Sequence, residues 1–356
     1  MHTPGHTHHH VSYVLRDITG AVTAVFTGGS MLHGTTGRTD LLGAEHTHEL
    51  TRAQYQSVHR LAAVLPPDAT SVYPTHGFGS FCSATPPGSG DSSTIAEQRL
   101  SNPALTQDEQ AYVAELLEGL SAYPAYYAHM GVINQAGPAP VDLSLPEPVD
   151  PEEVRRRIDA GQWVVDLRNR TAFAAGHLSG TLGFELSGSF VTYLGWLHRW
   201  GEPLTLIGET LDQIAEARRE LVRIGVDHLD GAATGNIDDL RAGSTLRCYR
   251  TAGFADLAET LGSGEDFVVL DVRQRQEHDT SRIPGAINIP LHLLADRLHE
   301  LPDMPIWVHC GSGYRASIAA SIIDREGGGV VVLVDDEYST ADTLGLTSTR
   351  QPTDST

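Results

Sequence analysis

The 356-residue sequence has few cysteines, few basic side chains and no long apolar run. Three cysteines (Cys82, Cys248 and Cys310) are too few for a disulfide framework, so we expect a protein of the reducing cytoplasm. The 24 basic residues against 45 acidic ones argue against nucleic acid and anionic membranes as partners. No segment approaches the ~20 apolar residues of a membrane span. The first residues also lack the basic and apolar regions of a secretory signal.

The length is sufficient for two or three domains. Proline and glycine gather near residues 138–148, which is typical of a linker. We expect three units, at residues 1–137, 145–238 and 246–338. The tail at residues 339–356 is polar and rich in serine and threonine, and is therefore expected to be disordered.

The second and third units repeat one plan. Each has a helix-like stretch, then a buried strand that ends in an acid and an arginine, then a glycine-containing turn, and then a strand after a proline. The acid and arginine are Asp166 and Arg168 in one copy, and Asp271 and Arg273 in the other. Strands that alternate with helices predict an α/β fold with a parallel sheet covered on both faces.

A short apolar strand, Trp307 to His309, ends at Cys310 and leads into a glycine-rich loop that closes on Arg315. A helix-like segment follows. Such a loop points several backbone N–H groups at one spot and adds the positive end of the helix, so it stabilises an anion, including the thiolate of Cys310. The alternative is a buried structural cysteine at a strand end. The two glycines and the arginine favour the reactive cysteine.

The loop has the spacing Cys-x4-Arg, one residue shorter than the Cys-x5-Arg loop of phosphate-handling cysteine enzymes. The smaller ring suits a single extra sulfur on Cys310 better than a tetrahedral phosphate. Residues 246–338 resemble a rhodanese domain, the sulfurtransferase fold. The segments that match are residues 268–273, Glu277 with residues 282–290, and the cysteine loop itself.

This resemblance implies that Cys310 carries a persulfide, that Arg315 anchors the loop, and that Asp271 and Arg273 preset its geometry. The remaining loop residues would wrap the sulfur with backbone amides: Gly311, Ser312, Gly313 and Tyr314. The donor would be thiosulfate, glutathione persulfide or a similar compound, and the acceptor a thiol. His309 is left out of the site, because successive side chains at a strand end point to opposite faces.

In the first copy the position that corresponds to Cys310 is Gly208, and residues 209–213 replace the glycine loop and its arginine. Without a thiol there is no covalent sulfur chemistry, and Glu209 and Asp212 would repel an anionic donor. The first copy is therefore expected to be an inactive rhodanese-like domain with a structural role.

Residues 1–137 place His6 before a strand at 11–15, and a second strand at 21–26 before Thr27-Gly28-Gly29-Ser30. With Gly37-Arg38-Thr39-Asp40 and the segment around His76, this order resembles the second half of a metallo-β-lactamase fold. The segments around Cys82 and at residues 124–130 resemble the persulfide dioxygenase branch. The whole chain then predicts a partial αββα sandwich followed by two rhodanese-like α/β domains with parallel sheets.

In that branch two histidines and an aspartate hold a single iron. His6 matches one histidine, and Gly29 stands where the aspartate is expected. His76 matches a histidine that serves a second metal in relatives. The other ligands belong to a His-x-His-x-Asp-His segment that should lie upstream of His6. We therefore expect iron or zinc only if donors from outside this chain complete the site, because coordination needs converging ligands.

Half a sandwich would leave an apolar sheet face and an open edge. We expect either that Met1 is not the start of the ancestral domain, or that a second copy or another partner covers this surface. Three functions remain open: a sulfurtransferase, a persulfide dioxygenase with an accessory rhodanese unit, and a sensor or binding protein for sulfane sulfur.

Overall fold

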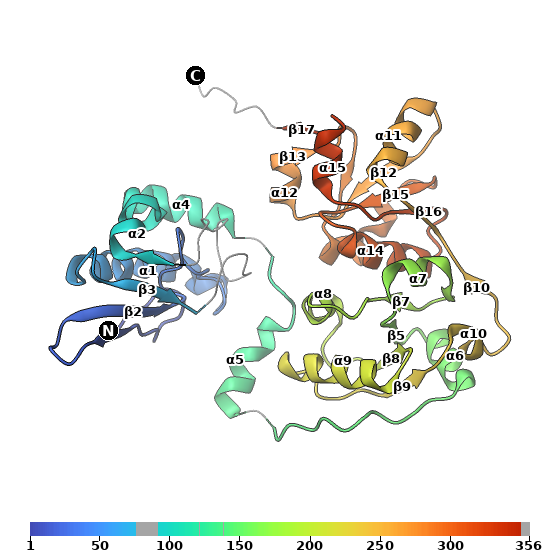
Figure 1. The fold of residues 1–356 in the computed structure, drawn as a ribbon, viewed down its shortest axis with the longest axis horizontal. Coiled ribbons are helices and arrows are strands. Elements are labelled where there is room, and N and C mark those ends of the chain that lie inside the picture. The colour runs from blue at the N-terminus through green and yellow to red at the C-terminus, as the bar shows by residue number, and fades with distance from the viewer. Residues whose placement is uncertain (76–91, 121, 138, 350–356) are drawn as a thin grey trace. The chain divides into compact units, whose positions relative to one another are not determined.

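The computed structural model describes residues 1–75, 92–120, 122–137 and 139–349 (Figure 1). The chain divides into two compact units, unit 1 (Met1–Tyr123) and unit 2 (Pro124–Thr356). The break at residue 123 lies ahead of the proline-rich linker near residues 138–148. Within the described ranges, no helix is both long and apolar enough to cross a membrane.

Unit 1 is a four-stranded mixed sheet with helices on one face. The strands run in the order β1-β2-β3-β4, and only the central β2·β3 pair is parallel. The strands are β1 (Tyr13–Arg16), β2 (Val22–Gly28), β3 (Ser71–Pro74) and β4 (Ser93–Thr94). The helices are α1 (Ala44–Val64), α2 (Ile95–Ser101), α3 (Pro103–Thr106) and α4 (Glu109–Gly119).

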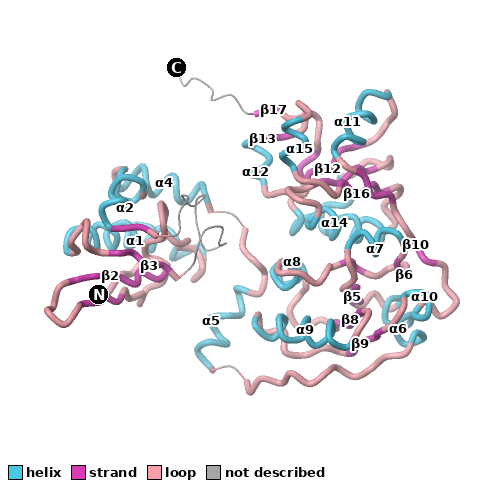
Figure 2. Tube along the Cα trace, in the orientation of Figure 1, coloured by secondary structure: helices cyan, strands magenta, loops and turns pink. Residues whose placement is uncertain are grey.

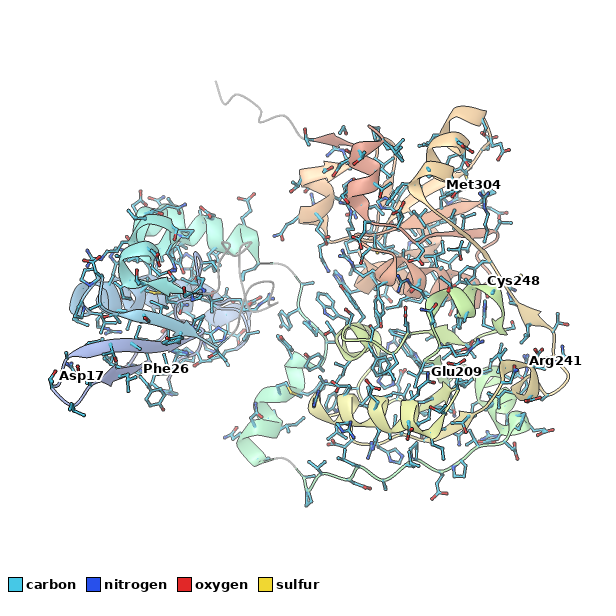
Figure 3. All side chains as sticks on the ribbon, viewed as in Figure 1. Asp17, Phe26, Glu209, Arg241, Cys248 and Met304 are labelled. Carbon is cyan, nitrogen blue, oxygen red and sulfur yellow. The ribbon has the colours of Figure 1, made fainter. Side chains whose placement is uncertain are left out.

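The two faces of the unit 1 sheet differ in burial. Val25 of β2 packs with Val58 and Leu61 of α1 in the core of the unit. On the opposite face Tyr13, Leu15, Phe26 and Tyr73 are 69, 50, 47 and 50% exposed, and the last two stack with ring centroids 5.4 Å apart. Phe26 is labelled in Figure 3. The helices therefore cover one face of this sheet and leave an aromatic face uncovered.

Unit 2 begins with α5 (Tyr127–Ala136) and continues with two α/β repeats. The first repeat has a parallel sheet in the order β7-β5-β8-β9, and β6 pairs with β10 beside it. Its helices are α6 (Pro151–Asp159), α7 (Arg170–Ala175), α8 (Phe190–Leu197), α9 (Leu211–Arg223) and α10 (Ile237–Leu240). Its strands are β5 (Trp163–Asp166), β6 (His177–Leu178), β7 (Leu182–Gly183), β8 (Leu204–Gly208) and β9 (Gly231–Thr234).

The second repeat follows β10 (Leu246–Arg247) and has a five-stranded parallel sheet in the order β11-β16-β15-β12-β14. Its strands are β11 (Arg250–Ala252), β12 (Val268–Asp271), β13 (Ser281–Arg282), β14 (Ile287–Asn288), β15 (Ile306–His309), β16 (Val331–Val334) and β17 (Ser348–Thr349). Its helices are α11 (Phe254–Ser263), α12 (Arg275–Thr280), α13 (Leu294–Arg297), α14 (Tyr314–Arg325) and α15 (Tyr338–Thr343), with two 3₁₀ turns (Leu291–Leu293 and Leu298–Glu300).

The strand order β7-β5-β8-β9 of the first repeat is matched by β14-β12-β15-β16 of the second. Figure 2 shows the strands of both repeats with helices beside them. The strands form because β-branched runs such as Val268-Val269 are buried on both faces of each sheet. The parallel α/β fold expected from the sequence is therefore present, and the duplicated plan extends to the order of the strands.

The two repeats share one hydrophobic core. Leu206 and Leu221 of the first repeat belong to the same buried cluster as Val308 and Ile318 of the second. A buried polar contact adds to it, because His177 in β6 lies 3.1 Å from the carboxylate of Asp324 in α14. The first repeat is thus held against α14, the helix that follows the cysteine loop.

The expectation of a disordered tail from residue 339 is wrong for residues 339–349. They form most of α15 and the short strand β17, which pairs with β13. Composition predicted disorder because serine and threonine dominate. Ala341 is nevertheless fully buried, and Leu346 packs against the same cluster, so a few apolar contacts order the segment. Residues 350–356 lie outside the described part of the chain.

Candidate functional site

Cys310 follows the last residue of β15, the strand that lies between β16 and β12 in the sheet of the second repeat. All four residues of β15 are buried, and Cys310 is 1% exposed. Helix α14 begins four residues later at Tyr314. A central strand thus delivers the thiol to the carboxyl edge of the sheet, where ligands of open α/β sheets bind.

The cysteine loop, residues 310–315, leaves its amide groups available. Among the described residues, the backbone N–H groups of residues 311–316 have no hydrogen-bond acceptor. The carbonyl oxygens of Gly311 and Gly313 instead accept bonds from the N–H groups of Tyr338 (2.9 Å) and Ser317 (2.8 Å). Free N–H groups beside a helix N-terminus attract negative charge. The loop can therefore hold an anion next to Cys310.

At both glycine positions of the loop, a side chain would contact a neighbouring charged residue. Gly313 has a φ of 84°, and a Cβ built there would lie 1.9 Å from Oδ1 of Asp335. At Gly311 a Cβ would lie 3.2 Å from a guanidinium nitrogen of Arg315. A larger residue at position 313 would have to displace Asp335, and one at position 311 would press on Arg315.

Arg315 forms a two-pronged ion pair with Glu277 of α12, with N–O distances of 2.6 and 2.8 Å. Burial raises the pKa of Glu277, but the hydrogen bonds and the charge of Arg315, with smaller contributions from Gln274 and Arg273, together lower it overall. Burial also opposes the charge on Arg315, yet the same pair raises the pKa of the guanidinium. The pair is thus fully ionised at neutral pH, and it fixes Arg315 over Gly311.

Asp271 and Arg273 lie behind the loop at the carboxyl end of β12. Arg273 donates to both oxygens of the buried Asp271 carboxylate and to the carbonyl of Ser281 (2.7 Å). Its guanidinium carbon lies 3.6 Å from the ring centroid of Tyr338, and the backbone N–H of Tyr338 donates a hydrogen bond to the carbonyl oxygen of Gly311. A continuous set of contacts therefore leads from Asp271 through Arg273 and Tyr338 to the cysteine loop.

His309 lies on the other side of the strand from Cys310. Its ring stacks on Tyr338 (centroids 5.6 Å apart) and meets Phe254 edge-on (5.7 Å). Burial lowers the pKa of His309 to about 4. The imidazole is therefore neutral at pH 7 and packs against the rings of Tyr338 and Phe254.

Residues of the first repeat reach the cysteine loop, and sequence reasoning missed them. The hydroxyl of Tyr314 donates to the carbonyl of Glu185 (2.6 Å). Arg170 pairs with both Glu185 and Asp335 at 2.7 Å. The ring of Tyr193 in α8 lies 5.7 Å from that of Tyr314. The pairs Tyr314–Glu185 and Arg170–Asp335 are 129 and 165 residues apart along the chain, so no local pattern could have revealed them.

The corresponding loop of the first repeat is filled by a side chain. Gly208 ends β8, and the N–H of the next residue, Glu209, donates to Oε1 of Gln213 (2.7 Å). That oxygen would lie 3.2 Å from a Cβ at Gly208. The amide of Gln213 thus takes an N–H group that a bound anion would use, and no thiol is present.

Among the residues that the structure describes, the predicted metal ligands of unit 1 do not form a metal site. Nδ1 of His6 lies 2.7 Å from the carbonyl oxygen of Arg38. A Cβ at Gly29, where the aspartate is expected, would lie 2.3 Å from Cδ2 of His6, so the ring occupies that space. No group of three or more potential ligands occurs within the described ranges, and His76 lies outside them. The described residues therefore do not supply the converging ligands that iron or zinc needs.

Comparison with known proteins connects this geometry to families. Residues 254–339 match the family described as Rhodanese-like domain. A sulfurtransferase of Allochromatium vinosum is 32% identical over 77 residues, which is 21% of this chain and 72% of that protein. The HTH-type transcriptional regulator Rv0324 of Mycobacterium tuberculosis is 31% identical, over 31% of this chain and 65% of that protein.

Among solved structures, a metallo-beta-lactamase from Staphylococcus aureus subsp. aureus COL is similar with a TM-score of 0.56 and 25% identity. The similarity covers 66% of each chain, so it is not confined to unit 1. This chain therefore spans slightly less than two thirds of that structure and of the mycobacterial regulator. Through the domain that carries Cys310, the chain belongs to the rhodanese-like family.

Proposed function

We propose that this protein is a sulfurtransferase in which Cys310 forms a persulfide and passes its outer sulfur to a thiol acceptor. The observation that carries the proposal is the cysteine loop: a buried thiol at the carboxyl end of β15, next to backbone N–H groups without acceptors among the described residues. Arg315, fixed by Glu277, adds a positive charge. Such a site favours negative charge on sulfur.

The proposed reaction is a pair of displacements at sulfur. The thiolate of Cys310 attacks the sulfane sulfur of the donor, and a new S–S bond forms at Sγ. The donor's own S–S bond breaks, and its electron pair leaves with sulfite from thiosulfate or with the thiolate from glutathione persulfide. An acceptor thiolate then attacks the outer sulfur, and the Cys310 thiolate is released. No external oxidant or reductant is needed.

Each predicted site residue has a role in this reaction. Residues 311–314 (Gly311, Ser312, Gly313 and Tyr314) supply amides that stabilise the anionic outer sulfur. Arg315 adds charge and closes the loop. Asp271 and Arg273 are positioning residues, because they act through Tyr338 on the carbonyl of Gly311.

The direct test is mass spectrometry of the intact protein and of its proteolytic peptides after incubation with thiosulfate. We expect a gain of about 32 Da, one sulfur atom, on a peptide that contains Cys310, as for any thiol that stores a transferred sulfur. Cys310→Ser is expected to abolish both the mass gain and turnover. Cys248→Ser is the matched control, because Cys248 is exposed and lies outside the loop (Figure 3). Turnover that persists in Cys310→Ser would refute the proposal.

A sensor that only binds sulfur differs from an enzyme in turnover. With excess thiosulfate and cyanide, an enzyme produces many equivalents of thiocyanate for each protein molecule, whereas a sensor releases at most one. The buried thiol beside a positively charged side chain favours the enzyme. A yield of one equivalent of thiocyanate per protein molecule would favour the sensor.

The domain assignment is part of the proposal. Residues 246–338 are the active rhodanese domain, residues 145–238 an inactive rhodanese-like copy, and residues 1–137 a metallo-β-lactamase-like domain related to persulfide dioxygenases. The match to the staphylococcal structure and the shared strand order of the two repeats support it. Because the described residues of unit 1 bring no three potential metal ligands together, we assign no dioxygenase step to this chain. Metal analysis after iron loading is expected to find far less than one iron per chain.

A further inference from the structure

The thiol of Cys310 is covered. It is 1% exposed, yet a sulfur donor has to reach it. Helix α8 of the first repeat supplies part of this cover, because Tyr193 of α8 packs against the buried cluster that contains both Cys310 and Tyr314. The inactive repeat therefore contributes to the surroundings of the nucleophile.

Tyr193 lies close to the charged groups of the site. Its phenol is within electrostatic range of Arg315, Cys310 and Glu277. Its ring centroid is 5.7 Å from that of Tyr314, with the planes inclined by 37°. Burial raises the pKa of Tyr193, so the phenol keeps its proton and acts as a hydrogen-bond donor at neutral pH.

The Tyr193 hydroxyl is also available. Tyr314, its neighbour, uses its own hydroxyl to bond Glu185. For Tyr193, no hydrogen bond to any residue in the described part of the chain is formed. A half-buried phenol with an unused donor beside a positively charged loop is suited to an anionic ligand.

The packing of α8 does not depend on Tyr193. Phe190 and Leu194 of the same helix are fully buried and belong to the shared core. Tyr193 lies on the neighbouring side of the helix and is only half-buried. Its hydroxyl can therefore be removed without taking an apolar contact from the core.

We propose that Tyr193 of the inactive repeat determines which sulfur donor reaches Cys310. This inference rests on the proposed function. The Tyr193 hydroxyl binds the anionic group of a compact donor, and its ring obstructs a bulky one. The inactive copy thereby determines the donor specificity of the active copy.

During transfer from a compact donor such as thiosulfate, the Cys310 thiolate bonds to the outer sulfur and the donor's S–S bond breaks. The electron pair leaves on sulfite. A hydrogen bond from Tyr193 to a sulfonate oxygen strengthens as sulfite gains that charge, so the hydroxyl contributes most in the transition state. A peptide persulfide such as that of glutathione lacks this oxyanion and has to displace the ring.

The test compares two donors on three variants. Tyr193→Phe keeps the ring and removes the hydroxyl, whereas Tyr193→Ala removes both. Tyr249→Phe is the matched control, because the Tyr249 hydroxyl is also buried without a partner among the described residues but faces Asp324 and Asp166. Steady-state kcat and KM are measured with thiosulfate and with glutathione persulfide, and thermal unfolding checks the fold of each variant.

For Tyr193→Phe we expect kcat/KM with thiosulfate to fall about 10-fold, the usual effect of losing one hydrogen bond to a charged group. Its kcat/KM with glutathione persulfide should stay within about twofold. Tyr193→Ala should show the same loss with thiosulfate and a gain with glutathione persulfide. If Tyr193 had a purely structural role, its substitution would lower kcat/KM with both donors by the same factor. Tyr249→Phe should leave kcat/KM unchanged with both donors.

The outcomes separate this inference from the proposed function. If the wild type accepts sulfur but the ratio of the two kcat/KM values is unchanged in both Tyr193 variants, the selectivity role is refuted and the sulfurtransferase stands. A parallel loss with both donors also refutes it. If the wild type accepts sulfur from neither donor, the proposed function and this inference fall together.

Discussion

Substitution of Gly313 by alanine tests the geometry of the cysteine loop most directly. Gly313 has a φ of 84°, a conformation that costs an L-residue about 1–2 kcal/mol. The new Cβ would also lie 1.9 Å from Oδ1 of Asp335, so this carboxylate has to rotate away. Rotation breaks its ion pair with Arg170, in which Asp335 is 11% exposed. A charged hydrogen bond in such a place is worth about 1–3 kcal/mol.

We therefore expect Gly313→Ala to lower the free energy of unfolding of unit 2 by about 2–5 kcal/mol. Gly264→Ala is the matched control. Gly264 has a φ of 78° at the end of α11, and no atom lies within 4 Å of a Cβ built there. It should show only the backbone cost of about 1–2 kcal/mol. The rate of sulfur transfer should fall in Gly313→Ala and stay unchanged in Gly264→Ala.

Tryptophan fluorescence during urea unfolding is a suitable assay, because all four tryptophans (Trp163, Trp196, Trp200 and Trp307) lie in unit 2. A double-mutant cycle adds a sharper test. In an Asp335→Ala background the clash is absent, so Gly313→Ala should cost at least about 1 kcal/mol less than in the wild type. Equal losses for Gly313→Ala and Gly264→Ala, or strict additivity in the cycle, would show that Asp335 does not press on the loop as described.

Three further predictions concern other contacts. Glu277→Gln replaces an ionic acceptor of Arg315 by a neutral one and should destabilise unit 2 by about 1–3 kcal/mol and slow persulfide formation; an unchanged rate would contradict the anchoring role of Arg315. The pKa of His309 is about 4 in the folded protein and 6.5 ordinarily, so between these pH values the unfolded chain binds one proton more than the folded chain. The free energy of unfolding should therefore fall as the pH drops from 6.5 towards 4, by on the order of 3 kcal/mol in total. His309→Phe should flatten this slope in urea titrations and keep sulfur transfer, whereas an unaltered slope would assign the acid sensitivity to other groups. Gly29→Asp should fail to create an iron site, because the ring of His6 occupies the space; stoichiometric iron by metal analysis would show that the loop rearranges.

Local patterns determined much of this protein in advance. Short β-branched runs, proline- and glycine-rich turns and helical stretches in alternation predicted a parallel α/β fold, because such sheets bury both faces. The duplication of the two repeats was visible from the paired Asp and Arg at the carboxyl ends of β5 and β12. The cysteine loop was equally local, since Cys310, two glycines and Arg315 lie within six consecutive residues.

The same local reasoning failed where a few distant contacts decide the outcome. The polar tail predicted disorder, yet Ala341 and Leu346 find an apolar cluster and order residues 339–349. In unit 1 the histidines suggested a metal remnant, and only the close approach of His6 to the backbone at Gly29 shows that the ring fills the place of a missing ligand. Composition measures how many groups are present and not where they converge.

What the amino-acid sequence determined by itself was the position of Cys310, the loop around it and the α/β plan of the repeats, because these depend on neighbours along the chain. Only the tertiary structure decided that side chains of the first repeat lie next to the cysteine loop. Tyr193, Glu185 and Arg170 reach the cysteine loop across more than 100 residues of sequence. Such contacts follow from the shared core of two sheets, and no periodicity or motif encodes which side chains meet there.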